Sequence, residues 1–408
     1  MYQIKELANG IRIVHQEVTH TRLVHCGFVL NIGSRDETKE QEGLAHFWEH
    51  MAFKGTKKRK TFHIINRLES LGGELNAYTT KEKICFYASV LKEHYSKAAD
   101  LLFDITFNSI FPAKEIEKER QVILEEMSMY RDSPDDSIQD ELDALVFENH
   151  SLGRNILGTE ETVSKFSQQD FFDFISTRLD TSQVVFSIVG NISFSKALKA
   201  IEGPLSEIQP KRTLYARSAF HTYAPQVKTI NRDITQSLCA LGRPAYSQHD
   251  PNRYKLFLLN NILGGPSMNS RLNLALREKY GYVYSIESSY QPFSDTGFFG
   301  IFFGTEEKTL KKSTQIVHRE LHKLRTKKLG TMQLHMAKEQ AIGQMAMAEE
   351  NYAALMLVFG KSLIDHGKID PLERIFEQIR STTAEEVLAI AEEIFNPEQL
   401  SYLTYLPN

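Results

Sequence analysis

The clearest pattern along the chain is an amphipathic helix followed by a β-rich run, and this pattern occurs twice. Residues 167–189 (SQQDFFDFISTRLDTSQVVFSIV) align without a gap with residues 383–405 (TAEEVLAIAEEIFNPEQLSYLTY) at an offset of 216 positions. Each copy opens with a hydroxyl residue and an acid three positions later, which is typical of a helix N-terminus. Each then has a helical period of apolar positions and ends in a β-rich run.

A second pair of segments repeats at nearly the same offset, about 215 positions. The strand-like ICFYASV (84–90) with a helical run after it matches GFFGIFFG (297–304), which a helical run also follows. Two repeated segments at nearly the same offset predict an internal duplication into two similar α/β domains of roughly 200 residues each. The alternative is a chance likeness, since helix-strand pairs look alike when only polarity is compared; two α/β domains are expected in either case.

The domain junction is expected where prolines punctuate the chain, between Pro204 and Pro225. This predicts a first domain at 1–208, a linker at 209–224 and a second domain at 225–408. The second half contains no His-x-x-Glu-His motif, so metal chemistry is expected in the first domain only.

Composition and charge narrow the class of protein. Apolar residues make up 41% and charged residues 25% of the 408 residues, as in ordinary globular proteins. The net charge of −4 gives no long-range field that would attract nucleic acid or an anionic membrane, so neither is expected as a partner. The three cysteines form no CxxC pair, no apolar run is long enough to span a membrane, and the N-terminus lacks a signal-peptide pattern. A cytoplasmic location is expected.

The stretch AHFWEHM (45–51) contains the strongest candidate chemistry. Residues four apart lie on one face of a helix, so the imidazoles of His46 and His50 can converge on one metal ion. Glu49 stands beside them, where its carboxylate can reach a water on such an ion without being a ligand. The alternative is a pair of histidines that only form hydrogen bonds with their neighbours.

A hydrolytic zinc ion needs a third protein ligand and one open position for water. The acidic helical segment 115–127 supplies candidates. Glu119 and Glu126 are seven residues apart and share a face of this helix, while Glu125 is rotated by about 100°. The alternative for this segment is a charged helix exposed to solvent.

Five runs spread over nearly the whole chain match the pattern of one known family. They are GSRDETKEQEGLAHFWEHMAFKGT (33–56), LGGELNAYTT (71–80), EKERQVILEEM (117–127), LGGPSMNSRLNLALREKYGYVYS (263–285) and MAKEQAIGQMAMAEENYAALMLVFGKSLIDHG (336–367). Together they resemble the inverzincin metallopeptidases of family M16, the pitrilysin and mitochondrial-processing-peptidase group, in its short, two-domain, bacterial-type form. The resemblance implies an α+β chain of the LuxS/MPP-like metallohydrolase fold. Its two homologous α/β sandwich-like domains would each have a mixed, mostly antiparallel sheet with helices packed on one face.

The resemblance also implies roles for the residues of the metal centre. His46 and His50 match the two zinc-binding histidines, Glu126 matches the distal glutamate ligand, and one Zn²⁺ per chain is implied. Glu49 matches the general base. Glu119 matches a further acid of the family, placed to orient a histidine or the water.

The substrate-binding residues are likewise implied by the resemblance. Asn76 and Ala77 match the start of the family's substrate-binding edge strand, to which an extended peptide can add through backbone hydrogen bonds. Arg277 and Tyr284 match the arginine and tyrosine by which the second domain holds substrate. The duplicated halves would face each other across a cavity, within one chain, in a homodimer or in a heterodimer with a related M16 subunit.

These patterns together predict a zinc-dependent metalloendopeptidase that hydrolyses unfolded peptides or presequence-like segments with a zinc-bound water activated by Glu49. The first alternative is a non-catalytic peptide-binding subunit of a heterodimeric M16 processing peptidase. Such subunits usually lose a ligand or the base, whereas all four residues are present here. A second alternative, a peptide-binding scaffold with a structural metal, would need a fourth protein ligand.

Overall fold

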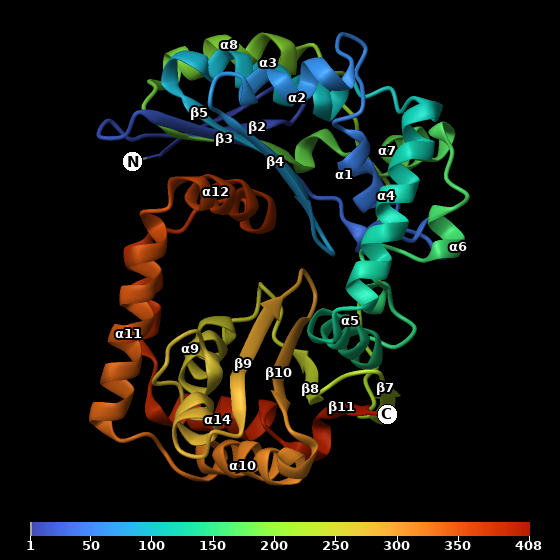
Figure 1. Ribbon diagram of the computed structural model, residues 1–408. Coiled ribbons are helices and arrows are strands. Elements are labelled where there is room, and N and C mark those ends of the chain that lie inside the picture. Colours follow the sequence, from blue (N-terminus) through green and yellow to red (C-terminus); the bar gives the residue numbers. More distant parts are fainter. Residues whose placement is uncertain (1) are drawn as a thin grey trace. The chain divides into compact units, whose positions relative to one another are not determined.

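The chain forms two mixed β-sheets, each in its own compact unit, in a computed structural model that describes residues 2–408 (Figure 1). Unit 1 comprises Met1–Met127, Arg154–Arg217 and Met347–Ile369. Unit 2 comprises Ser128–Gly153, Ser218–Ala346 and Asp370–Asn408.

The two sheets have the same strand order over five strands. Unit 1 contains β1 (Tyr2–Glu6), β2 (Arg12–Glu17), β3 (Leu23–Leu30), β4 (Glu74–Thr79), β5 (Ile84–Leu91) and β6 (Val184–Gly190), in the order β1-β2-β6-β3-β5-β4. Unit 2 contains β7 (Val227–Arg232), β8 (Ser237–Ala245), β9 (Val283–Pro292), β10 (Gly297–Thr305) and β11 (Ser401–Pro407), in the order β7-β11-β8-β10-β9. Each sheet has one parallel pair of strands, β2–β6 in unit 1 and β7–β11 in unit 2. All other strand pairs of the two sheets are antiparallel. The predicted pair of similar domains with mixed, mostly antiparallel sheets is confirmed.

The helices follow the same duplication. The first half of the chain contains α1 (Leu44–Met51), α2 (Thr61–Glu69), α3 (Tyr95–Phe107), α4 (Ala113–Arg131), α5 (Pro134–Val146), α6 (Glu160–Val163), α7 (Gln168–Arg178) and α8 (Phe194–Ser206). The second half contains α9 (Arg253–Gly264), α10 (Glu307–Thr326), α11 (Thr331–Glu349), α12 (Tyr352–His366), α13 (Leu372–Ser381) and α14 (Ala384–Ile394). Helices α7 and α14 start and end exactly 216 residues apart, as the sequence pattern predicts.

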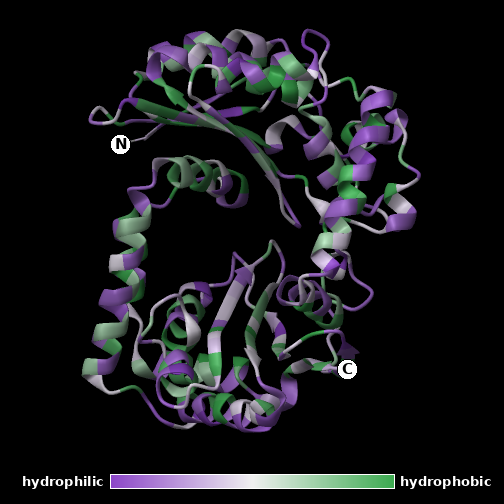
Figure 2. Cartoon of the chain, viewed as in Figure 1, coloured by the Kyte–Doolittle hydropathy of each residue, from purple (hydrophilic) through white to green (hydrophobic). Residues whose placement is uncertain are grey.

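The sheet of unit 1 is covered on both faces, whereas the sequence predicts helices on one face. Ile13 belongs to the core under α3 and α8, and its neighbour Val14, which points to the opposite face, packs with Met356 and Phe359 of α12. The Ser187 hydroxyl of β6 donates to the Met356 carbonyl at 2.6 Å. Figure 1 shows α12 across the sheet from α2, α3 and α8, and Figure 2 shows hydrophobic residues along the strands and on α12.

The sheet of unit 2 is also covered by helices on both faces. Cys239 of β8 belongs to the core that includes α9, α10 and α14, and its neighbour Leu238 packs with Leu142 and Val146 of α5. The compact units therefore depart from the predicted boundaries 1–208 and 225–408, because α5 lies in unit 2 and α12 in unit 1. Amphipathic periodicity shows that a helix buries a face but not which sheet receives it. The predicted linker 209–224 contains no helix or strand.

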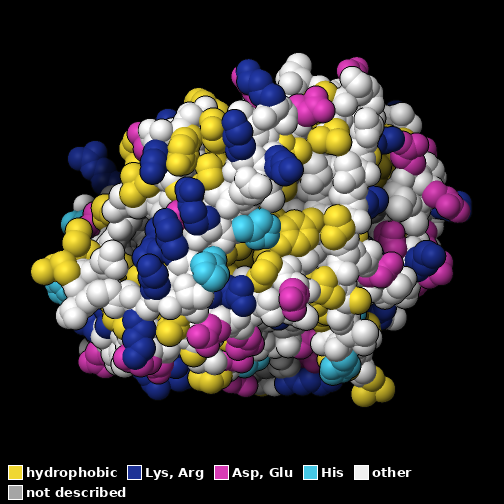
Figure 3. Space-filling model, turned by 90° about the horizontal axis from the view of Figure 1, so that it is seen from below, with side chains coloured by type: hydrophobic (Ala, Val, Ile, Leu, Met, Phe, Trp, Pro, Cys, Tyr) yellow, Lys and Arg dark blue, Asp and Glu magenta, His cyan; other side chains and the backbone are white. Residues whose placement is uncertain are grey.

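Charged side chains of both signs occur on the surface. On the face drawn in Figure 3, Lys and Arg side chains gather beside two histidines, and Asp and Glu side chains lie elsewhere on the same face. Within residues 2–408, no helix combines the length and the apolar character needed to cross a membrane.

Candidate metal centre

Helix α1 holds three of the predicted site residues in unit 1. Its apolar residues Phe47, Trp48 and Met51 are buried in the core, which turns His46, Glu49 and His50 to another face. That face is directed toward α4, which carries the acidic candidates.

The N-terminus of α1 is fixed by a buried carboxylate. Gly43 precedes the helix with φ +93°, and a Cβ there would lie 2.4 Å from the Leu157 carbonyl oxygen, so no side chain can cap the helix from this position. Glu37 takes over this role: its carboxylate accepts the N–H groups of Gly43 at 3.0 Å and of Ala45 at 2.7 Å. Burial raises the pKa of Glu37.

Replacing Glu37 with alanine is expected to destabilise the protein by about 2 kcal/mol or more, because it leaves two buried N–H groups without an acceptor. Urea denaturation followed by circular dichroism measures this change. Glu40→Ala is the matched control, since Glu40 is exposed in the neighbouring turn. An unfolding midpoint for Glu37→Ala equal to that of the control would contradict the capping role.

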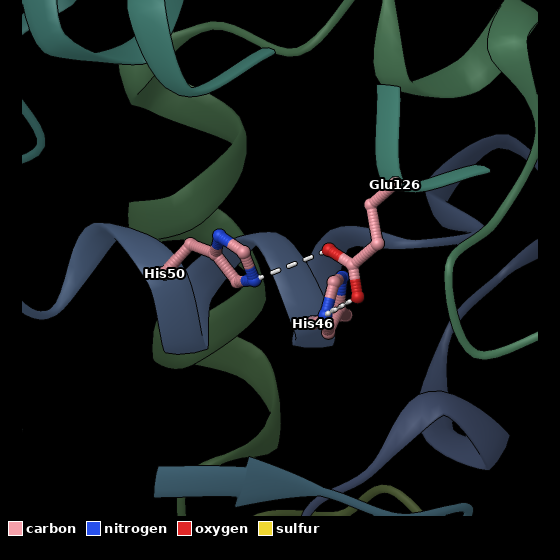
Figure 4. A group of neighbouring side chains, drawn as sticks. All are labelled: His46, His50 and Glu126. Carbon is pink, nitrogen blue, oxygen red and sulfur yellow. Dashed lines mark ion pairs between the residues drawn. The ribbon is translucent and has the colours of Figure 1, made fainter. Parts of the chain in front are cut away.

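His46, His50 and Glu126 form a group whose donor atoms lie within 4.8 Å of one another, and it is the one group of His, Cys, Asp or Glu side chains within residues 2–408 that could hold a metal ion. The Glu126 carboxylate faces both imidazoles, with one oxygen directed toward each ring (Figure 4). Its Oε1 is 3.8 Å from Nε2 of His46 and its Oε2 is 3.6 Å from Nε2 of His50.

These separations fit a shared zinc ion. They are too long for hydrogen bonds, whereas two donor atoms on one tetrahedral zinc ion lie roughly 3.4 Å apart. Two imidazoles and one carboxylate are a common donor set of hydrolytic zinc sites. Because the group within residues 2–408 has three members, a tetrahedral ion held by it would keep one position open for water.

Glu119 orients the His50 ring from the same helix as Glu126. Its Oε1 lies 3.0 Å from Nδ1 of His50, and its Oε2 lies 2.6 Å from the ammonium group of Lys54. Holding Nδ1 leaves Nε2 of His50 directed toward Glu126, which is the orientation a metal ligand needs.

The environment shifts the pKa values of the cluster. Burial and the neighbouring His50 lower the pKa of His46 to about 3, so its imidazole is neutral and able to bind a metal at neutral pH. Burial lowers the pKa of His50, but Glu119, Glu126 and Glu49 more than offset this, and the net shift is upward. Burial raises the pKa of Glu49 and of Glu126.

The predicted peptide-binding residues lie on the strand next to α1. Asn76 and Ala77 belong to β4, which forms the edge of the unit 1 sheet and pairs with β5 on its inner side. The last residue of β4, Thr79, donates a hydrogen bond from its hydroxyl to Oε2 of Glu49 at 2.6 Å. The strand therefore reaches the proposed base directly.

Arg277 and Tyr284, the predicted pair of the second domain, lie close together in unit 2. Arg277 lies in a π-helical segment, Asn273–Glu278, and Tyr284 lies in β9. The guanidinium carbon of Arg277 is 5.7 Å from the Tyr284 ring centroid, and Tyr284 is 85% exposed. Such an exposed aromatic-cation pair is able to contact a ligand.

Three positioning residues were not among the predicted site residues. Glu37, Lys54 and Thr79 all contact residues of the site or of its helix. The sequence carried a partial signal for them, because each lies within a run that matches the family pattern, but no spacing rule connects them to α1.

Comparisons with known proteins identify the family of the chain. The model for "Insulinase (Peptidase family M16)" matches residues 12–160, and the model for "Peptidase M16 inactive domain" matches residues 165–341. A protein of Bacillus subtilis named "Uncharacterized zinc protease YmxG" is 35% identical over 392 residues, which cover 96% of this chain and 95% of that protein. The chain belongs to peptidase family M16. An M16 relative from Rickettsia felis, named "Uncharacterized zinc protease", is 34% identical over 397 residues, covering 97% of this chain and 95% of its own length.

Solved structures share this M16 fold. A Pseudomonas fluorescens structure titled as a peptidase M16 inactive domain superposes with a TM-score of 0.92 at 19% identity, covering 100% of this chain and 98% of that one. A protease from Helicobacter pylori superposes with a TM-score of 0.89 at 19% identity, covering 100% and 99%. The two family-model matches and the relatives of nearly equal length confirm the short, two-domain form of M16 that the sequence indicates.

Proposed function

We propose that this M16 protein is a zinc-dependent endopeptidase that hydrolyses unfolded peptides or presequence-like segments. The observation that supports it most is the convergence of His46 and His50 of α1 with Glu126 of α4, together with the position of Glu49 on the same helix as the two histidines. The names of the curated relatives, zinc proteases, point to the same chemistry.

Each residue of the centre has a task in the proposed reaction. His46, His50 and Glu126 would hold the metal, and zinc, when bound there, supplies a Lewis acid that acidifies water and polarises the scissile carbonyl. Glu49 takes the proton of the attacking water and passes it to the leaving amine nitrogen. Glu119 keeps the His50 ring in place through Nδ1.

The edge strand β4 supports the proposed preference for unfolded chains. Within residues 2–408 its outer edge has no partner strand, so an extended peptide can add to it through backbone hydrogen bonds at Asn76 and Ala77. Most of the backbone of a folded protein is already hydrogen-bonded within the fold, so it offers far fewer free extended segments than an unfolded chain does. We infer that side chains along the peptide contribute less to recognition than its backbone does.

Endoproteolysis is tested by digesting a reduced, carboxymethylated protein and its folded form, and identifying the products by mass spectrometry. Internal fragments from the unfolded substrate alone are expected. Stepwise loss of terminal residues, or equal digestion of the folded form, would contradict the proposed activity.

Two alternatives make different use of the same residues. A non-catalytic peptide-binding subunit of a heterodimeric M16 peptidase would not need Glu49 beside three ligands, yet all four side chains are present. A structural metal would need a fourth protein ligand, and the group within residues 2–408 contains three.

Arg277→Ala is expected to lower the turnover of peptides by roughly 10-fold or more without changing zinc content, because the guanidinium would contact the substrate and not the metal. Steady-state kinetics and metal analysis of the purified variant measure both quantities. Arg374→Ala is the control, an exposed arginine of α13 in unit 2. Loss of zinc in Arg277→Ala would contradict the assigned role.

A further inference from the structure

Thr79 makes the one hydrogen bond that the Glu49 carboxylate receives within residues 2–408. It is the final residue of β4 and shares a strand face with Ala77, which packs against the core of unit 1. Its hydroxyl therefore points to the side of the sheet that α1 occupies. A β-branched side chain on a strand has few rotamers, so the direction of the hydroxyl is well defined.

The hairpin turn that follows Thr79 is attached to a separate loop. The N–H of Ser34 donates to the Thr80 carbonyl at 3.2 Å, and the N–H of Arg35 donates to the Lys81 carbonyl at 2.7 Å. A Cβ at Gly33 would lie 2.4 Å from the Thr80 carbonyl oxygen, so this close approach requires glycine.

The same loop also contacts the N-terminus of α1, the helix that carries His46, Glu49 and His50. Two residues after Arg35, the Glu37 carboxylate binds the N-terminal N–H groups of α1. The turn after β4 and the start of α1 are thus both hydrogen-bonded to one short segment, residues 33–37. This segment sets the position of Thr79 relative to Glu49.

We propose that Thr79 is the positioning residue of the general base: its hydroxyl holds Oε2 of Glu49, which leaves Oε1 free for proton transfer, and it links the base to the strand that binds the peptide. This inference rests on the proposed peptidase function. A peptide paired along β4 orders the end of the strand and, through Thr79, the Glu49 carboxylate. The same strand therefore binds the unfolded segment and orients the base.

Thr79→Val is expected to lower kcat roughly 10- to 100-fold, the scale of one hydrogen bond to a charged group. KM for a quenched-fluorescence peptide and the zinc content are expected to stay within about 2-fold of wild type, since neither depends on the orientation of Glu49. Thr79→Ser keeps the hydroxyl and is expected to retain most of kcat. Thr79→Ala provides a second variant without the hydroxyl should the valine not fit.

Thr80→Val is the matched control for Thr79. Within residues 2–408, the Thr80 hydroxyl forms hydrogen bonds only inside the turn, to the backbone of Lys83 and Glu82. Its loss is expected to lower the melting temperature while kcat stays within about 2-fold. In Glu49→Asp, whose shorter carboxylate does not reach Thr79, adding Thr79→Val is expected to have little further effect.

Three results would overturn the inference: an unchanged kcat in Thr79→Val, a loss of zinc that accounts for its lower kcat, or equal losses in the serine and valine variants. Each of these is read against an active wild type. Wild-type protein that is loaded with zinc and cleaves no peptide contradicts the proposed function itself, so the two failures are distinguishable.

Discussion

Replacing Glu126 with alanine is expected to remove most of the bound zinc and all measurable peptide cleavage. Two imidazoles alone are an incomplete ligand set for a catalytic zinc ion. The loss of affinity should exceed the roughly 10- to 100-fold that follows removal of an outer partner such as Glu119. Metal analysis after dialysis and a quenched-fluorescence assay measure the two effects.

Glu125→Ala is the matched control for Glu126. The two glutamates are neighbours on α4, but Glu125 is exposed and does not belong to the metal-binding group. It is expected to keep full zinc content and activity. Stoichiometric zinc in Glu126→Ala after dialysis would contradict the assigned ligand set.

Glu49→Gln is expected to lower kcat by roughly 10²- to 10⁴-fold, the range for loss of a general base. Glutamine has the same shape and its amide oxygen can still accept the Thr79 hydrogen bond, but it cannot take up the proton of water. Zinc content should equal that of wild type, because Glu49 is not a member of the ligand group. Single-turnover kinetics of the zinc-loaded variant measure the loss, and a rate close to that of wild type would rule out Glu49 as the base.

The duplicated fold was predictable from the sequence because its signals are local and repeat at a constant offset. Helices α7 and α14 each have their own capping pattern, and the strands β6 and β11 that follow them are each rich in β-forming residues. The exchange of α5 and α12 between the units was not predictable. It depends on which of two similar apolar sheet faces each helix contacts, and the polarity of a helix does not encode this.

Part of the candidate site was likewise predictable from the sequence and part was not. The relation between His46, Glu49 and His50 follows from the period of one helix, and the face shared by Glu119 and Glu126 follows from another. Their convergence over 76 residues of sequence was supplied by the family resemblance. The contacts of Glu37, Lys54 and Thr79 depend on tertiary packing, so no spacing in the sequence shows them.

The measurement that tests the central claim most directly is cleavage of a broad quenched-fluorescence peptide library by the purified full-length protein. The assay compares three states of the protein: loaded with zinc, after removal of the zinc by a chelator, and after one equivalent of zinc has been added back. The account predicts cleavage by the loaded protein, its loss on chelation and its recovery with zinc. Zinc-loaded protein that cleaves no peptide, or cleavage that chelation leaves unchanged, would contradict it.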